Sequence, residues 1–100
     1  MNRKQLETMT KIFIVIETWG RGVEHDDPTV VPFSTREKAR DHLKQLVKDD
    51  QTNGITTPMQ SDLEENPDSW EVTDEPDRYY AFCEDRNCWY DVWVEGHDIR

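Results

Sequence analysis

Two cysteines, Cys83 and Cys88, are the first residues of this chain whose type and spacing suggest chemistry. A zinc site would need two further ligands, and the imidazoles at His25, His42 and His97 lack the paired spacing of a zinc motif. A redox pair is usually Cys-x-x-Cys at the start of a helix, which differs from this Cys-x4-Cys arrangement. We therefore expect two packed thiols, with a structural disulfide as the second interpretation and a metal site as the third.

The other polar clusters do not form a catalytic pattern. The stretch EHDD at residues 24–27 lacks the alternating spacing of a calcium-binding loop. Gly20 and Gly22 are too short a match for a phosphate-binding loop. We interpret the further acidic runs as solvated surface. The sequence therefore predicts no enzyme, with no catalytic residue, metal or cofactor.

Charge decides which kinds of partner the chain can attract. Its 22 acidic and 12 basic residues give a net charge of −10, and only 34% of the 100 residues are apolar. Such a field repels nucleic acid and anionic lipid and attracts basic surfaces, although solubility is the simpler explanation. Four tryptophans and an aromatic content of 10% argue against a disordered chain. We therefore expect one folded domain that contacts neither nucleic acid directly nor a membrane.

The beginning of the chain indicates where the protein works. The longest apolar run, residues 12–16, is too short to span a membrane. Residues 1–10 are basic without an apolar centre, so they do not match a signal peptide. We expect residues 1–10 to form a loose polar arm and residues 11–100 to form the domain. The expected location is the cytoplasm, where thiols stay reduced.

The first half of the chain contains the elements that must carry the early apolar residues. Residues 11–18 begin with a β-branched apolar run, which is typical of a central strand covered on both faces. Residues 29–31 follow as a short strand that Pro32 would confine to a sheet edge. Ser34 and Glu37 have the spacing of a capping box, which predicts a helix over 34–48. One apolar stripe of that helix consists of Ala39, Leu43, Leu46 and Val47.

The second half of the chain predicts a short helix that starts at a capping box at Thr57 and ends near Glu65. Strands are predicted after it at 69–73, 79–85 and 88–95. A turn of two or four residues between the last two strands gives the same pairing register. One face of this hairpin holds small, aliphatic and tyrosine side chains: Tyr79, Ala81, Cys83, Cys88, Tyr90, Val92 and Val94. The other face interleaves aromatic and acidic side chains: Tyr80, Phe82, Glu84, Trp89, Asp91, Trp93 and Glu95.

The two faces of the hairpin predict different roles. The first face carries no charge, so we expect it to form the core beneath the helical stripe. The second face has two interpretations. It is either ordinary cross-strand packing, covered by the connector 49–69 with Met59 and Trp70 filling in, or a binding surface whose tryptophans anchor a partner. A homodimer interface is one form of the second interpretation.

A resemblance supports the fold class. The residues Val30, Phe33, Ser34, Thr35, Glu37, Lys38 and Ala39 after the KIFIV strand resemble small uncharacterised bacterial and phage proteins with an F-S-T-x-E-K-A helix start. The resemblance implies an α+β fold with a small antiparallel sheet and one main helix, and it implies no catalytic residue. Many such proteins occur in phages and mobile elements, where small acidic proteins sometimes inhibit host defence.

Together these patterns predict an α+β fold, with a small antiparallel sheet of three to five strands and helix 34–48 packed on one face. The first functional hypothesis is a non-enzymatic interaction domain, in the finer form a phage or mobile-element inhibitor of a basic or nucleic-acid-binding host protein. Its predicted contact residues are Trp89, Trp93, Tyr80, Phe82 and Asp91. The alternative is a small metal- or thiol-dependent domain that uses Cys83, Cys88 and a histidine.

Overall fold

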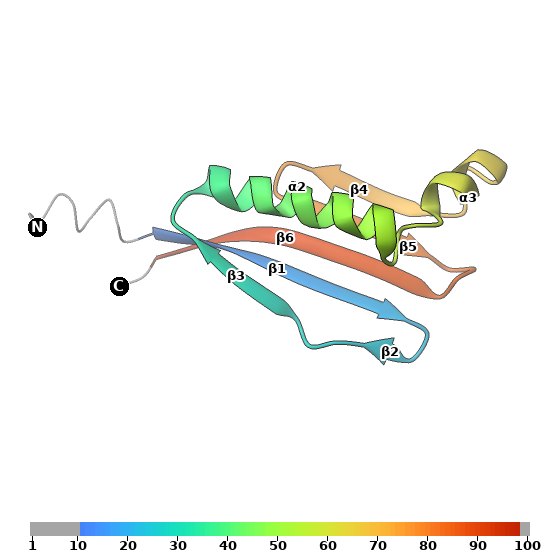
Figure 1. Ribbon diagram of the computed structural model, residues 1–100, viewed down its shortest axis with the longest axis horizontal. Coiled ribbons are helices and arrows are strands. Elements are labelled where there is room, and N and C mark those ends of the chain that lie inside the picture. Colours follow the sequence, from blue (N-terminus) through green and yellow to red (C-terminus); the bar gives the residue numbers. More distant parts are fainter. Residues whose placement is uncertain (1–10, 99–100) are drawn as a thin grey trace, which may run out of the picture.

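Two long strands, β1 (Lys11–Arg21) and β6 (Cys88–Asp98), pair antiparallel along their whole lengths inside one sheet (Figure 1). The structure is a computed structural model that describes residues 11–98. The other strands are β2 (Glu24–His25), β3 (Thr29–Phe33), β4 (Glu71–Glu75) and β5 (Arg78–Cys83), and the helices are α2 (Arg36–Asn53) and α3 (Met59–Glu65). The predicted α+β fold is therefore confirmed, with six strands instead of three to five. The predicted arm at 1–10 lies outside the described residues.

The path of the chain explains the order of the strands. The sheet order is β2-β1-β6-β5-β4, and β3 also pairs with β1, so β2 and β3 together form one edge. Pro32 lies in β3 at this edge, as predicted, where its missing N–H interrupts no inner ladder. The helices carry the chain across to β4 at the opposite edge, and a meander through β5 returns it to β6 beside β1 (Figure 1).

β1 differs from its prediction in length and in cover. It continues to Arg21, because Gly20 and Arg21 pair with both β6 and β2. Val15 lies on the face that packs in the core and is 1% exposed. Ile12, Ile14 and Ile16 lie on the other face of the strand and stay partly exposed. The expectation of a strand covered on both faces is wrong, because an antiparallel sheet can leave one face without helices.

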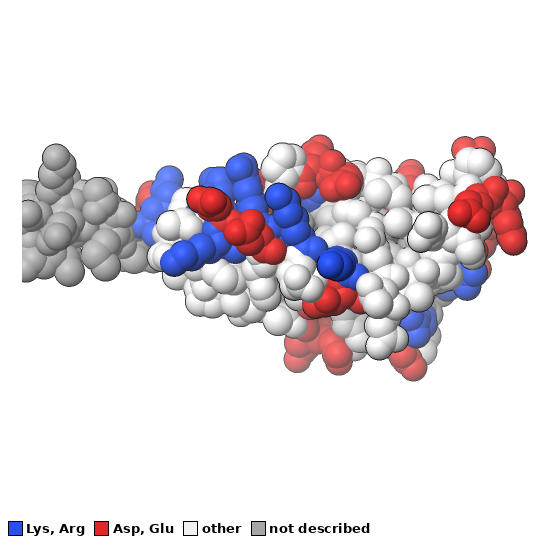
Figure 2. Space-filling view, turned by 45° about the horizontal axis from the view of Figure 1, so that its top comes forward, with Lys and Arg blue, Asp and Glu red and all other residues white. Residues whose placement is uncertain are grey.

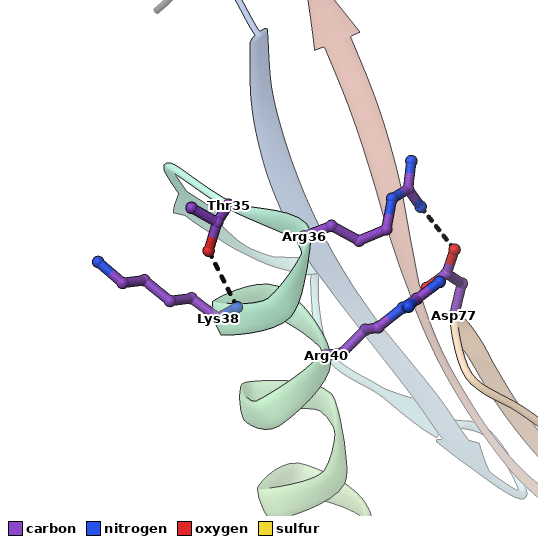
Figure 3. A network of polar contacts seen from close by, with 5 residues as sticks. All are labelled: Thr35, Arg36, Lys38, Arg40 and Asp77. Atoms are coloured by element: carbon purple, nitrogen blue, oxygen red, sulfur yellow. Dashed lines mark hydrogen bonds and ion pairs between the residues drawn. The ribbon is translucent and has the colours of Figure 1, made fainter.

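The start of α2 lies one residue later than the predicted capping box. Thr35 has extended backbone angles and is the N-cap, and its hydroxyl accepts a hydrogen bond of 3.2 Å from the amide of Lys38 (Figure 3). Ser34 precedes this N-cap and therefore does not cap the helix as predicted. Both residue types are good caps, so composition alone could not choose between them.

The end of α2 lies five residues beyond the predicted end at Lys48. The carboxylate of Asp50, within the last turn, accepts hydrogen bonds from the amides of Ile55 and Thr56 at 2.8 and 3.0 Å. These bonds fold the following loop back onto the helix, so polar residues continue the helix where apolar periodicity has already ended. Ile55, which follows the turn, is buried in the core.

α3 ends at Glu65, as predicted, but its start is not capped as predicted. The hydroxyl of Thr57 accepts from the amide of Gly54 at 2.7 Å and does not cap α3, which begins after Pro58 without a side-chain cap. The connector from α2 to β4 packs on the same side of the sheet as α2, because Trp70 is in the main core cluster and Met59 packs against it.

The core lies between α2 and one face of the sheet. All seven residues predicted for the uncharged face of the hairpin are buried: Tyr79, Ala81, Cys83, Cys88, Tyr90, Val92 and Val94. From the helical stripe, Ala39 and Leu43 are buried, and Leu46 and Val47 pack at the margin. The four-residue turn at 84–87 pairs Cys83 with Cys88, so the predicted register is confirmed.

Two aspartates fix the helices to the turns of the meander. Asp77, between β4 and β5, accepts from Arg36 at 2.6 Å and from Arg40 at 2.5 Å, and these two arginines lie one turn apart on α2 (Figure 3). Asp62 of α3 accepts from Arg86 at the β5–β6 turn and from the indole of Trp70 at 3.0 Å.

Among the described residues, neither helix is long and apolar enough to cross a membrane.

Candidate functional site

The sheet face that points away from α2 and α3 is the open face of this protein. The register of the strands places alternate residues of β1, β3, β4, β5 and β6 on it. Its apolar members are Ile12, Ile14, Ile16, Val30, Pro32, Tyr80, Phe82, Trp89 and Trp93. Neither helix of the described chain packs on this face. Apolar side chains that cluster on one exposed face of a protein often mark an interaction site.

All five predicted contact residues lie on the open face. Phe82 is directly opposite Trp89, and Tyr80 is directly opposite Asp91, across the β5–β6 pair. Trp93 is on the same side of β6, and each of the five is partly exposed. The alternative interpretation, that the connector 49–69 covers this face, is wrong, because the connector packs against the core on the helical side.

The indole of Trp89 lies across β1 at Gly20. A Cβ atom added at Gly20 would be 2.5 Å from the Trp89 Nε1 atom and 2.8 Å from its Cε2 atom. These distances are shorter than ordinary contact, so the ring occupies the space that a side chain would need. Glycine at position 20 therefore lets Trp89 lie against the sheet, where its position is fixed before any partner arrives.

Trp93 is held by polar contacts at the other end of the open face. Its indole N–H donates to the carboxylate of Glu95 at 2.9 Å, and His97 lies 2.8 Å from the other carboxylate oxygen. The hydrogen bond from Trp93, followed by that with His97, lowers the pKa of Glu95. A hollow of about 430 Å³ opens beside Trp93, where β5 ends and β6 continues paired with β1 only. The ring thus stands at the rim of a cavity.

Arg78 links the polar and aromatic parts of the open face. Its guanidinium donates to both carboxylate oxygens of Asp91, at 3.2 and 2.9 Å, and lies 5.5 Å from the centre of the Tyr80 ring. The hydrogen bonds with Asp91 raise the pKa of Arg78. Bidentate pairing and stacking on an aromatic ring both restrict the rotamers of the participating side chains. The predicted contact residue Asp91 is therefore already paired within the chain.

The open face is mainly acidic, whereas the helical side carries charges of both signs. The strands present the carboxylates of Glu71, Glu75, Asp91 and Glu95 and the guanidinium of Arg78 on the open face. On the helical side, basic side chains gather in a band over α2, and acidic side chains predominate over α3 (Figure 2). An acidic rim around apolar anchors selects basic partners and steers their approach.

The cysteine pair lies on the opposite side of the sheet from the open face. Cys83 and Cys88 are free thiols, 1% and 3% exposed, and face the core. Burial, and then the neighbouring Cys83, raise the pKa of the Cys88 thiol. No group of three or more His, Cys, Asp or Glu residues gathers within 11–98 to hold a metal ion. Within this range, the structure does not bring a histidine to the thiols as the alternative hypothesis requires.

A second hollow, of about 370 Å³, lies between β1 and the end of α2 on the helical side. The buried hydroxyl of Tyr90 donates to the carboxylate of Glu17 at 2.6 Å in its wall, and burial raises the pKa of Tyr90. Asp50 also lines this hollow, but its carboxylate is occupied by the loop amides. The carboxylates of Glu17 and Asp50 are therefore explained by hydrogen bonds within the fold.

Some residues of the open face were not predicted from the sequence. The isoleucines of β1 were assigned to a covered strand, because they are as apolar as their neighbour Val15. Arg78 and Gly20 carried no local signal, because their contacts depend on strands distant in the sequence.

Comparison of the chain with protein-family models, curated proteins and solved structures found no match. The resemblance to small phage proteins thus stays a prediction.

Proposed function

We propose that this chain is a non-enzymatic protein-interaction domain that binds a basic partner through its open face. The observation that carries the proposal is the position of the predicted contact residues. Trp89, Trp93, Tyr80, Phe82 and Asp91 share one sheet face with the isoleucines of β1, and neither helix packs on it. An apolar face of this width is costly to leave in water, so a partner that covers it gains binding energy.

The arrangement of the anchors supports tight binding. Trp89 is fixed over Gly20, and the indole of Trp93 is hydrogen-bonded to Glu95. Tryptophan and tyrosine dominate binding hot spots, and side chains that are already ordered lose little entropy when a partner arrives. The hollow beside Trp93 offers a place for a side chain of the partner.

Charge supports the choice of a basic partner. The net charge of −10 attracts basic proteins over a distance of about 10 Å at ordinary salt concentrations, and the carboxylates at the margins of the open face act at contact. In the finer form of the proposal, the partner is a nucleic-acid-binding host protein whose basic surface this domain occupies. The domain would then inhibit the partner by competing with its nucleic acid.

The test is a titration with an identified partner. A tagged wild-type domain captures proteins from a lysate, the captured protein is identified and purified, and its affinity is measured by calorimetry. Changing Trp89→Ala and Trp93→Ala together should weaken binding about 30-fold or more, because each ring is expected to be a hot spot. Val23→Ala is the matched control, since Val23 is 97% exposed in the β1–β2 turn and belongs to no strand of the open face.

The outcomes separate the alternatives. Unchanged affinity of the double variant, with an intact near-ultraviolet circular dichroism spectrum, would show that the partner binds elsewhere. Capture of a second copy of this chain, lost in the double variant, would identify the open face as a homodimer interface and overturn the basic partner.

A further inference from the structure

β4 is an outer strand of the sheet, and the space beside it is not filled by another described strand. A two-residue turn joins Glu75 of β4 to Arg78 of β5, so these two residues form a hydrogen-bonded pair. Bonded pairs alternate along an antiparallel ladder, and the backbone N–H and C=O groups of Val72 and Asp74 therefore point away from β5. Such an edge is a template for another strand.

A hollow lies between this edge and α2. It has a volume of about 510 Å³, with Leu43 and Val47 of α2 on one side and Asp74 of β4 on the other. Val72, on the core side of β4, is 43% exposed because no described strand lies beyond β4. Apolar side chains of an added strand would cover Val72 and reach this hollow.

Charge around the edge differs between its two sides. Glu71 and Glu75 are exposed on the open-face side of β4, four residues apart. On the other side, Lys44 and Lys48 of α2 line the hollow together with Asp74, which is exposed on the helical side of β4. Basic residues of an added strand are thus favoured opposite the two glutamates, since opposite charges stabilise a cross-strand pair, whereas on the helical side the two lysines offset the charge of Asp74.

We propose that the basic partner docks an extended segment on β4 as an additional strand of the sheet. This inference rests on the proposed function and specifies how the partner meets the margin of the open face. The segment alternates in character. Basic side chains lie opposite Glu71 and Glu75, and apolar side chains lie on the helical side, next to Val72 and the hollow. Strand addition supplies backbone hydrogen bonds for affinity, and the alternating side chains supply selectivity.

The probe is a nine-residue peptide with the central sequence Lys-Val-Thr-Val-Lys, flanked by Ser-Gly and Gly-Ser. The central sequence reads the same in both directions, so a parallel and an antiparallel strand present the same side chains. A peptide with the centre Val-Lys-Thr-Lys-Val has the same composition and charge, but its lysines are two residues apart and cannot pair with both glutamates. Binding is followed in ¹H–¹⁵N spectra of the full chain, together with amide exchange.

The first expected result is protection of the edge. The Lys-Val-Thr-Val-Lys peptide should slow amide exchange at Val72 and Asp74 tenfold or more at saturation, and the control peptide should bind more weakly. Changing Glu71→Lys and Glu75→Lys should weaken binding about 2- to 30-fold, from two cross-strand charge pairs of the usual strength. A peptide with glutamates in place of its lysines should restore binding to this variant.

A matched variant separates position from total charge. Glu64→Lys with Glu65→Lys changes the net charge by the same amount on exposed residues of α3, and it should leave the affinity near that of the wild type. Equal loss in both double variants, or equal affinity for the two lysine peptides, would reduce the effect to general electrostatic attraction and overturn strand addition.

Failure of strand addition is distinguishable from failure of the proposed function. If the peptide shifts the indole signals of Trp89 and Trp93 without protecting Val72 and Asp74, strand addition is overturned and the open face still binds. If the peptide does not bind at millimolar concentration, strand addition is likewise overturned, and the titration of the Trp89→Ala and Trp93→Ala variant still decides the proposed function.

Discussion

Substitution of Gly20 by alanine tests the geometry of the open face at its narrowest contact. The new Cβ would be 2.5 Å from the Nε1 atom of Trp89, about 1 Å closer than two heavy atoms normally approach. The indole must therefore move away from β1. Overpacking of this kind costs about 1–3 kcal/mol, and alanine in place of glycine in a strand returns about 0.5–1 kcal/mol.

We expect the Gly20→Ala variant to lose about 1–2 kcal/mol of unfolding free energy, which lowers Tm by about 4–8 °C for each kcal/mol in a domain of this size. Urea denaturation of the wild type, of Gly20→Ala, of Trp89→Ala and of the double variant forms a double-mutant cycle. Without the indole, the same glycine substitution should be neutral or stabilising, because nothing else within 4 Å of the new Cβ is as near as this ring.

The cycle has a clear refuting result. If Gly20→Ala destabilises the protein by the same amount with and without the Trp89 side chain, the cost comes from the strand and not from the ring. Trp89 would then not lie across β1. A shift of Trp89 fluorescence to longer wavelength in the Gly20→Ala variant is the independent sign that the ring has moved into water.

Three further predictions concern the helical side of the sheet. The hydrogen bond from Arg86 lowers the pKa of Asp62 from 3.8 to about 2. This interaction therefore stabilises the fold above pH 3.8, and its contribution is lost as the pH falls toward 2. The Tm difference between wild type and Asp62→Asn should shrink over that range, and a difference that grew would contradict the assignment. Tyr90→Phe removes the 2.6 Å hydrogen bond to Glu17 and should cost about 1–2 kcal/mol in urea denaturation, whereas no loss would mean that water replaces it. The two buried cysteines should resist a thiol reagent in the folded protein and both react in denaturant; rapid labelling of the folded protein would place them at the surface.

The faces of the terminal hairpin could be predicted because two sequence signals agreed. Strand residues alternate between faces, and either turn length considered keeps Cys83 opposite Cys88. The uncharged face then had to be the buried one. The same reasoning failed for β1, because Ile12, Ile14 and Ile16 are as apolar as the buried Val15. Periodicity cannot identify an open face when both faces of a strand are apolar.

The ends of the helices depend on contacts that a local pattern does not contain. Ser34 and Thr35 are both good caps, and only the hydroxyl of Thr35 reaches the amide of Lys38. The last turn of α2 is polar, and it is stabilised by bonds from the following loop to Asp50. The contact between Gly20 and Trp89 joins residues 69 positions apart, so the alignment of β1 with β6 had to be known first.

The indole N–H signals of the four tryptophans give the most direct test of the open face as the binding surface. Trp89 and Trp93 lie on the open face, whereas Trp19 and Trp70 pack at the core on the helical side. In a ¹H–¹⁵N spectrum of the domain bound to its identified partner, the signals of Trp89 and Trp93 should shift, and those of Trp19 and Trp70 should stay near their free positions. Shifts confined to Trp19 and Trp70 would put the partner on the helical side and contradict the proposal.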